Sequence, residues 1–432
     1  MKITIFGTGY VGLVTAACLA KFGNEVLCID TNKTIINGLN KGRVPFYEPH
    51  LEKLIKANAA KKNISFSSSI SKGIEFSSIF FVCIGTPQKS NGSSDTSSIS
   101  KLADEIIKYA NEAKDIFIKS TVPVGFCNDF CNELNNRSNY KNTVSSNPEF
   151  LREGSAVKDF LKPDRVIVGT KDKRLQRLAT KIYSKIPSKK IIFMNSQSSE
   201  LSKYAANSFL ATKISFINEI AKVARSSGAD IRDVQNGIGS DNRIGKAFLY
   251  SGLGYGGSCF PKDINSLIYQ ASSKNIDLSI LSAVRKVNDH QLTSFKKKIL
   301  NYYQNQTLDK VITIWGMAFK PNTSDIRESR GLELARYLSS RFKEIRIFDP
   351  LASKNAKEAL TILGCNNIRV CNLKYSSIAN SSGLIVAVED LFYSDFEFAK
   401  FKKLIKNAVI FDGRNIFNKE NLELNEIQYL SF

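Results

Sequence analysis

Histidine is scarce in this sequence: only His50 and His290 occur among 432 residues. Metal sites in proteins are usually built from histidine and cysteine at short spacings. Neither histidine belongs to such a cluster, and Cys127 and Cys131, whose spacing suits one face of a helix, have no further ligand of this kind beside them. We therefore expect no metal site.

Long apolar runs are also absent. Residues Ile79–Ile84 form a run of strand length, far below the roughly 18 residues that a membrane-spanning helix needs. Residues Met1–Ala20 begin like a signal peptide, with Lys2 before an apolar stretch, but their glycines fall in a register that a cleaved leader would not need. We expect a soluble globular protein with a mature N-terminus and no membrane association.

The cysteines and the charge exclude two further classes. Eight cysteines are scattered, mostly in apolar surroundings, and a chain of this length does not need disulfides for stability. We therefore expect the protein to be located in a reducing cytoplasm. The formal net charge is +21, but the longest basic run is only Lys296–Lys298. Because no basic stripe is interleaved with aromatic residues, we expect a solvated surface that attracts anionic ligands, and no nucleic-acid binding.

The N-terminal segment has the pattern of a dinucleotide site. Lys2–Phe6 reads as a buried strand, Leu13–Phe22 as the helix after it and Glu25–Ile29 as a second strand that ends in Asp30. Strand and helix are joined by a G-x-G-x-x-G turn, Gly7-Thr8-Gly9-Tyr10-Val11-Gly12. A carboxylate at the end of the second strand accepts hydrogen bonds from the adenosine ribose and repels a 2'-phosphate, so NAD is favoured over NADP. The alternative is that Asp30 only caps the next helix.

Two later strands end in hydroxyl residues. Ile79–Ile84 is followed by Thr86, and Asp115–Lys119 is followed by Thr121. In an open parallel sheet the carboxyl ends of the strands form the edge where ligands bind. Both threonines are therefore candidate site residues.

Two pairs of polar residues occur at a spacing of four. Glu149 and Glu153 follow a further strand, and alone they are more typical of a solvated helix start. Lys203 and Asn207 lie in a helical pattern that runs from Ser199 to Gly228. A cation and an amide on one helix face can stabilise an oxyanion, although in an unknown helix they are more often surface residues.

The segment Gly254–Asp263 presents a single thiol between a glycine-rich turn and a helix start. Cys259 comes just before Pro261, which suits a first helical turn, and the helix dipole there favours the thiolate. Lys262 adds positive charge, and Asp263, four residues after the cysteine, is placed to act on a water. The alternative is a buried structural cysteine, but the flanking residues favour a nucleophile.

The C-terminal third repeats the α/β pattern without a dinucleotide fingerprint or a direct sequence repeat. The strands predicted here are Val311–Trp315, Ile345–Phe348, Gly383–Val388 and Val409–Phe411, with a helix at Gly331–Ser340. The expected fold class is α/β, with two Rossmann-like doubly wound domains joined by a long central helix. We expect an NAD-binding domain at 1–198, a central helical region at 199–300 and a second nucleotide-binding domain at 301–432.

From Met1 to about Arg414, these segments resemble the UDP-glucose/GDP-mannose dehydrogenase family. The Cys-Phe-Pro-Lys-Asp segment and the aromatic-rich approach Phe248-Leu249-Tyr250-Ser251-Gly252 are similar to its UDP-glucose branch. The resemblance implies an NAD-dependent four-electron oxidation of UDP-glucose to UDP-glucuronate through a cysteine thiohemiacetal and thioester. GDP-mannose or a UDP-N-acetylhexosamine remains an alternative substrate, and a non-catalytic nucleotide-sugar sensor is a further alternative that would need neither Cys259 nor Lys203.

The resemblance implies that the region 199–300 carries the dimer interface and that the domain 301–432 binds the UDP-sugar. It also implies roles for individual residues. The catalytic residues would be Cys259, Lys203, Asn207, Asp263, Thr121 and Glu149. The cofactor would contact Gly7, Gly9, Tyr10, Val11, Gly12, Asp30, Thr86, Thr121, Glu153, Lys262 and Arg327. The substrate would contact Glu149, Phe150, Leu151, Arg152, Glu153, Lys203, Asn207, Arg243, Phe248, Leu249, Tyr250, Ser251, Gly252, Gly256, Lys320 and Arg414.

Two implications concern assembly and a departure from the family pattern. Arg243 would reach the sugar nucleotide of the partner in a homodimer. Ile35 stands where family members commonly carry a lysine near the ribose, which weakens that contact with the cofactor.

Overall fold

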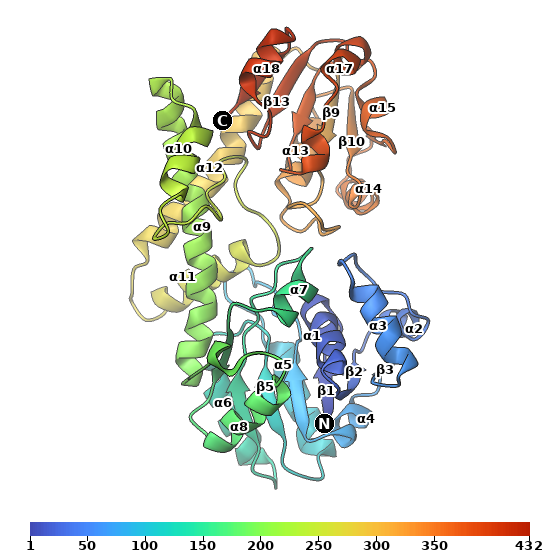
Figure 1. Ribbon diagram of the computed structural model, residues 1–432, viewed down its shortest axis with the longest axis vertical. Coiled ribbons are helices and arrows are strands. Elements are labelled where there is room, and N and C mark those ends of the chain that lie inside the picture. The colour runs from blue at the N-terminus through green and yellow to red at the C-terminus, as the bar shows by residue number, and fades with distance from the viewer. The chain divides into compact units, whose positions relative to one another are not determined.

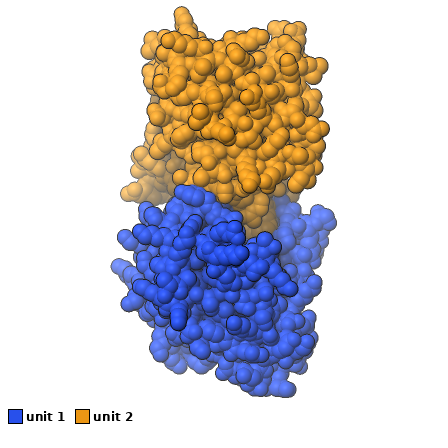
Figure 2. Space-filling model, turned by 90° about the vertical axis from the view of Figure 1, so that its right-hand side faces the viewer, with its two compact units in different colours: residues 1–206, 265–277 blue, residues 207–264, 278–432 orange.

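The structure, a computed structural model, describes residues 1–432 and divides into two units, coloured separately in Figure 2. Unit 1 contains Met1–Ala206 and Asn265–Asp277, and unit 2 contains Asn207–Ile264 and Leu278–Phe432. Each unit is built around one β-sheet (Figure 1).

The sheet of unit 1 has eight strands in the order β3-β2-β1-β4-β5-β6-β7-β8. The strands are β1 (Lys2–Phe6), β2 (Glu25–Ile29), β3 (Ile64–Ser67), β4 (Ile79–Val82), β5 (Asp115–Ile118), β6 (Thr143–Ser146), β7 (Val166–Gly169) and β8 (Ile191–Met194). The first six are parallel, in the Rossmann order 3-2-1-4-5-6.

The last two strands of this sheet run in the opposite direction, so the sheet is not parallel throughout. Strand β7 pairs antiparallel with β6 through Ser146 and Gly169, and parallel with β8. The connection after β6 remains at the carboxyl edge, where Asn147 Nδ2 donates to the Ile167 carbonyl at 2.7 Å. Strand β7 therefore starts at that edge and runs back.

Apolar side chains alternate along the strands of unit 1 and fill both faces of its sheet. Ile3 and Ile5 of β1 belong to one apolar cluster, and Phe6 belongs to another. This period of two is the geometry of a strand buried on both faces. The covering helices are α1 (Tyr10–Lys21), α2 (Lys33–Asn40), α3 (Leu51–Ala60), α4 (Ile70–Phe76), α5 (Ser97–Tyr109), α6 (Phe126–Arg137), α7 (Ala156–Leu161) and α8 (Lys173–Ile182), with a 3-10 turn at Ser188–Lys190.

The sheet of unit 2 has six parallel strands in the order β11-β10-β9-β12-β13-β14, which is again 3-2-1-4-5-6. The strands are β9 (Val311–Trp315), β10 (Glu344–Phe348), β11 (Ile368–Val370), β12 (Leu384–Val386), β13 (Val409–Asp412) and β14 (Gln428–Ser431). Its helices are α10 (Ile231–Gly239), α12 (Ser279–Tyr302), α13 (Arg330–Ser339), α14 (Ser353–Ile362), α15 (Lys374–Ile378), α16 (Leu391–Ser394), α17 (Phe398–Leu404) and α18 (Lys419–Leu424).

Two helices contribute residues to both units. They are α9 (Ser196–Ser227), the long central helix expected from the sequence, and α11 (Phe260–Ser272). Helix α9 stops where Gly228 takes a left-handed conformation, φ +75°, which is a common helix terminator. No helix of the structure combines the length and the apolar character that crossing a membrane requires.

The two units share one packing feature, a close contact between two glycines, although the two halves of the sequence are not repeats. A Cβ on Gly12 of α1 would lie 1.9 Å from the Gly7 carbonyl oxygen, and a Cβ on Gly331 of α13 would lie 2.2 Å from that of Gly316. In each domain, glycine lets the first helix pack directly against the turn after the first strand.

Several predicted boundaries were wrong by a few residues. Helix α1 begins at Tyr10, three residues before the predicted start, because extended Gly9 is its N-cap and Tyr10 and Val11 are already helical. Strand β12 is shorter than the predicted Gly383–Val388. Element ends depend on local hydrogen bonds that a hydrophobic pattern does not reveal.

Candidate active site

The glycine turn of unit 1 has room for a cofactor at one position only. A Cβ on Gly7 or Gly12 would meet backbone atoms, whereas a Cβ on Gly9 would have no atom within 4 Å. Gly9 caps α1 without a side-chain hydrogen bond, and no acidic residue lies in the first turn of that helix. The open space and uncapped backbone N–H groups therefore fit a pyrophosphate.

Asp30 lies beside this turn. Its Oδ2 accepts hydrogen bonds from the Thr8 backbone N–H and hydroxyl, both at 2.8 Å, and its Oδ1 accepts from Asn32 N at 2.9 Å. The N-cap of α2 is Asn32, whose side chain accepts from Thr34 and Ile35. The helix-capping alternative for Asp30 is therefore wrong, and the ribose contact stays a prediction.

Glu48, which the sequence reading missed, joins the glycine turn to the segment after β6. This buried carboxylate accepts hydrogen bonds from the Tyr10 hydroxyl, from Gly154 N at 2.6 Å and from Val157 N at 3.4 Å. Burial and the contact with Glu48 raise the pKa of Tyr10, so this phenol remains neutral. No local sequence pattern marks Glu48, because its partners are 38 and 106 to 109 residues away.

The two predicted threonines lie together at the carboxyl edge. The Thr86 hydroxyl donates to the Thr121 carbonyl at 2.7 Å. The loop after Thr121 is fixed by Glu200 of α9, which accepts from Gly125 N at 2.6 Å and Cys127 N at 2.8 Å and is itself buried.

A buried ion pair lies at the same edge. Lys203 Nζ is 3.0 Å from Glu149 Oε1, and the two side chains are only 5% and 9% exposed. Glu149 Oε2 also accepts from Leu151 N at 2.6 Å, which fixes the carboxylate within its own loop. A buried charge without its partner is costly, so neither residue can be replaced singly without a large effect. The interpretation of Glu149 as part of a solvated helix start was wrong.

The neighbouring predicted residues have different surroundings. The Phe150 ring lies 3.8 Å from the Arg165 guanidinium carbon and 5.4 Å from Lys203 Nζ. Arg152, predicted as a substrate contact, is exposed and forms an ion pair with Asp159 at 2.7 Å.

The loop before Cys259 is held tightly within unit 2. Gly257 has φ +82°, and a Cβ there would lie 2.6 Å from the Phe319 ring. A Cβ on Gly256 would lie 2.0 Å from the Glu328 carbonyl oxygen. The resemblance implies that Gly256 contacts the substrate; in the structure these two glycines let the backbone approach Phe319 and Glu328.

Helices α12 and α13 anchor the same loop through residues that the sequence reading missed. Asn288 Oδ1 accepts from Tyr255 N at 2.7 Å, and Arg330 Nε donates to the Tyr255 carbonyl at 3.0 Å. Both anchors are distant in sequence, so no local spacing points to them.

Cys259 stands at the start of α11, as predicted. Its carbonyl accepts from Asp263 N at 2.8 Å, which closes the first helical turn. Of the eight cysteines, Cys259 alone is exposed; Cys131 and Cys371 are half-buried and the others are buried. Burial raises the pKa of the Cys83 thiol to about 12, so buried thiols of this kind stay protonated and unreactive.

Asp263 is almost fully buried, with a partner on each oxygen. Asn207 Nδ2 donates to Oδ2 at 2.7 Å and Lys262 Nζ donates to Oδ1 at 2.5 Å. Lys262 was predicted to contact the cofactor, and in the structure its ammonium is hydrogen-bonded to the neighbouring Asp263 carboxylate. The two contacts hold the Asp263 carboxylate in one orientation, which is what a group directing a water needs.

Arg414 belongs to a loop built on the end of β13. Its Nε donates to the Ala387 carbonyl at 2.8 Å and lies 3.2 Å from Glu389 Oε2, and its Nη1 donates to the Gly254 carbonyl at 3.4 Å. Buried Asp412 accepts from Arg414 N at 2.9 Å and from the Tyr429 hydroxyl at 2.9 Å, and burial raises its pKa. The predicted Arg414 is therefore beside the turn that leads to Cys259.

The remaining predicted residues of unit 2 are mostly at the surface. Arg243 is highly exposed and pairs with Asp241, Arg327 pairs with Asp325, and Lys320 Nζ lies 5.7 Å from the Phe319 ring centroid. The approach Phe248–Gly252 is mixed: Tyr250 is exposed, Leu249 packs in an apolar cluster, and Ser251 accepts from Gln235 and Asn415. No group of three or more His, Cys, Asp or Glu residues could hold a metal ion.

Comparison with known proteins places these features in a family. Residues 1–187 match the NAD binding domain of the UDP-glucose/GDP-mannose dehydrogenase family, residues 197–290 its central domain and residues 313–419 its UDP binding domain. The chain belongs to this dehydrogenase family.

Individual relatives are similar to this chain over nearly its whole length. UDP-glucose 6-dehydrogenase YwqF of Bacillus subtilis (strain 168) is 38% identical over 436 residues, covering 100% of this chain and 97% of that protein. UDP-glucose 6-dehydrogenase of Pseudomonas aeruginosa is 35% identical over 426 residues, covering 96% and 94%. A UDP-glucose dehydrogenase structure from Pyrobaculum islandicum superposes with a TM-score of 0.90 at 32% identity, covering 100% and 96%.

Family membership confirms the expected fold class, the dehydrogenase chemistry and NAD as the cofactor. The individual site residues remain predictions.

Proposed function

We propose that this member of the dehydrogenase family oxidises UDP-glucose to UDP-glucuronate in a four-electron reaction with two NAD. The observation that carries the proposal is Cys259, an exposed thiol at the start of α11, held behind a glycine turn that is anchored to the second Rossmann domain. The full-length similarity to named UDP-glucose dehydrogenases supports the choice of sugar nucleotide.

The proposed first step converts the C6 alcohol of the glucose to an aldehyde. When bound, NAD would accept one hydride in each of the two oxidation steps. A water held by Thr121 and Asp263 takes the alcohol proton. Asp263 is suited to this because its hydrogen bonds with Asn207 and Lys262 hold its carboxylate in place.

The second half of the proposed reaction depends on the thiol. Cys259 attacks the aldehyde and forms a thiohemiacetal, whose oxidation leaves a thioester. Lys203 and Asn207 stabilise the oxyanions, and Glu149 and Asp263 direct the water that releases the carboxylic acid. The buried ion pair supports these roles, because it holds the Lys203 ammonium and the Glu149 carboxylate next to each other.

The proposal includes binding, assembly and location. Lys320 and Arg414 are cationic partners for the pyrophosphate of the sugar nucleotide.

The proposed homodimer interface includes an apolar stripe on α9, formed by Phe209, Phe216 and Val223, which are spaced by seven residues and at least half exposed. In such a dimer the highly exposed Arg243 would reach the partner's substrate. A cytoplasmic location follows from the need to keep the Cys259 thiol reduced. Segments 1–198, 199–300 and 301–432 are the proposed functional divisions.

The test is NADH formed per sugar consumed with UDP-glucose, GDP-mannose and two UDP-N-acetylhexosamines. We expect two NADH per UDP-glucose and slower turnover of the others. The variant Cys259→Ser should bind NAD and UDP-glucose but lose steady production of NADH, because a serine hydroxyl is a poor nucleophile and its esters react more slowly than thioesters. Two NADH per sugar at the unmodified rate from this variant would refute the mechanism.

A further inference from the structure

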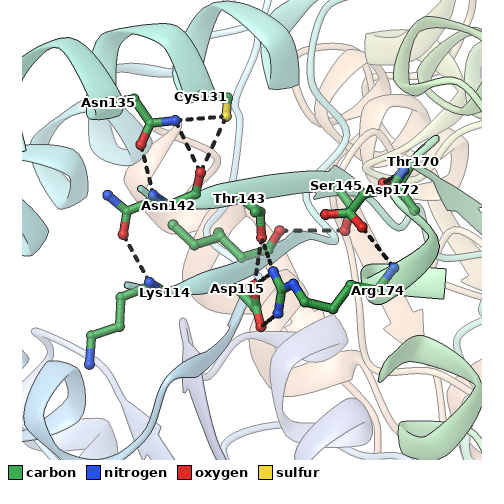
Figure 3. A network of polar contacts seen from close by, with 11 residues as sticks. Lys114, Asp115, Cys131, Asn135, Asn142, Thr143, Ser145, Thr170, Asp172 and Arg174 are labelled. Atoms are coloured by element: carbon green, nitrogen blue, oxygen red, sulfur yellow. Dashed lines mark hydrogen bonds and ion pairs between the residues drawn. The ribbon is translucent and has the colours of Figure 1, made fainter. Parts of the chain in front are cut away.

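Strand β5 is flanked by two buried lysines. Lys114 precedes the strand, and its Nζ donates to the Ile74 and Ser77 carbonyls at 2.8 and 3.0 Å. Lys119 follows the strand at the carboxyl edge and is 5% exposed. Figure 3 shows Lys114 within the polar network of the opposite edge. Buried ammonium groups are costly unless they are hydrogen-bonded, so each requires a reason.

Lys119 contacts the residue that begins the Glu149 segment. Its Nζ donates to Asn147 Oδ1 at 3.3 Å and to the Asn147 carbonyl at 3.4 Å. The Tyr183 hydroxyl donates to the same Oδ1 at 2.6 Å, and Asn147 Nδ2 donates to Ile167. Asn147 is fully buried and lies two residues before Glu149, so this network fixes the start of the loop that carries the carboxylate.

Lys119 also acts on the ion pair through its charge. Glu149 attracts its ammonium and Lys203 repels it, and Lys119, Glu149 and Tyr183 line one cavity of about 260 Å³. Glu149 therefore has two cations acting on it: Lys203 at 3.0 Å and Lys119.

The titration of Lys119 falls within a range that can be measured. Burial, opposed by attraction to Glu149, lowers the pKa of Lys119 to about 8. The facing groups Cys83 and Tyr183 stay neutral there, because burial raises the pKa of Cys83 to about 12 and that of Tyr183 still further. Below pH 8 the lysine carries its charge, and above it the charge is lost.

We propose that Lys119 is a positioning residue: it fixes Asn147 and adds a second positive charge beside the Glu149–Lys203 pair, so that the Glu149 carboxylate stays oriented to direct water. The inference rests on the proposed function. It assigns a role to a side chain that touches neither substrate nor cofactor in the proposed mechanism.

The test compares Lys119→Met with Lys114→Met, which removes another buried charge from the other end of the same strand. We expect Lys119→Met to lower kcat for UDP-glucose at about pH 7 by at least about tenfold, with KM changed by less than about threefold. The ratio of unmodified to variant kcat should shrink as the pH rises through 8, because the unmodified enzyme then loses the charge that the variant lacks. Lys114→Met should lower the melting temperature and keep the unmodified pH profile.

Three results would overturn the inference. If the ratio of unmodified to Lys119→Met kcat is constant with pH, the charge of Lys119 plays no part. If Lys114→Met loses as much kcat as Lys119→Met at every pH, the effect is one of stability. If Lys119→Met does not fold, Tyr183→Phe is the alternative variant, because it removes only the Tyr183 hydroxyl that donates to Asn147. This variant should lower kcat by the same factor at every pH, and an unchanged kcat would overturn the positioning role. Failure of the unmodified protein to form NADH from UDP-glucose would refute the proposed function instead, independently of the variants.

Discussion

Gly257→Ala tests whether the packing of the glycine turn positions the thiol. At φ +82° a non-glycine residue costs about 1 to 2 kcal/mol, and the new Cβ, 2.6 Å from the Phe319 ring, adds about 1 to 3 kcal/mol of overpacking. We therefore expect the free energy of unfolding to fall by about 2 to 5 kcal/mol. Denaturant titration followed by circular dichroism measures this loss.

The loss of activity should exceed what the loss of stability explains. Gly257 N donates to the Arg327 carbonyl at 3.1 Å, and Cys259 follows two residues later, so relief of the clash displaces the thiol. A shift of about 1 Å in a reacting group costs about a hundredfold in rate, and we expect a fall in kcat of this order in folded Gly257→Ala protein. NADH production at saturating UDP-glucose and NAD, well below the melting temperature, measures it.

Gly228→Ala is the matched control. Gly228 has a similar backbone conformation, φ +75°, but a Cβ on it would have no atom within 4 Å, so this change should cost only the backbone strain of about 1 to 2 kcal/mol and leave kcat unchanged. Phe319→Ala in the Gly257→Ala background should recover part of the lost stability, because it removes the clashing ring. Equal effects of the two alanine substitutions on stability and kcat would refute the reasoning.

Three further predictions concern the cofactor, the dimer and the far edge of the sheet. The unmodified enzyme should prefer NAD over NADP by at least about tenfold, roughly 1.4 kcal/mol, and Asp30→Ala should narrow this gap in kcat/KM; equal use of both by the unmodified enzyme would contradict the role of Asp30. Arg243→Ala should weaken UDP-glucose binding with NAD binding retained, and mixing it with inactive Cys259→Ala chains should restore activity in heterodimers; no recovery in verified heterodimers would remove support for a shared site. Arg174→Ala breaks the contact with Asp115 shown in Figure 3, yet should cost at most about 1 kcal/mol because the arginine is half exposed; a large loss of kcat would mean that this edge is coupled to the chemistry.

Local patterns in the sequence were sufficient to place the strands that it predicted and the start of α11, whereas the catalytic roles of the site residues remain predictions. Each predicted strand of the two Rossmann domains occurs, because runs such as Lys2–Phe6 and Val311–Trp315 are apolar enough to be buried on both faces of a sheet. The start of α11 at the thiol also followed from spacing alone, since Pro261 and the preceding glycines are local signals.

Tertiary structure alone decided how these residues are held. The reversal of β7 depends on where the chain lies after Asn147, and the partners of the site residues come from distant segments: Glu48 for Tyr10, Asn288 for Tyr255 and Lys119 for the Glu149 segment. The packing of Phe319 against Gly257 is of the same kind. The sequence by itself determined which groups are present and on which element, because those are properties of neighbouring residues. It could not determine their hydrogen-bond partners, because these contacts form only when separate elements pack together and the polar groups buried between them must be satisfied.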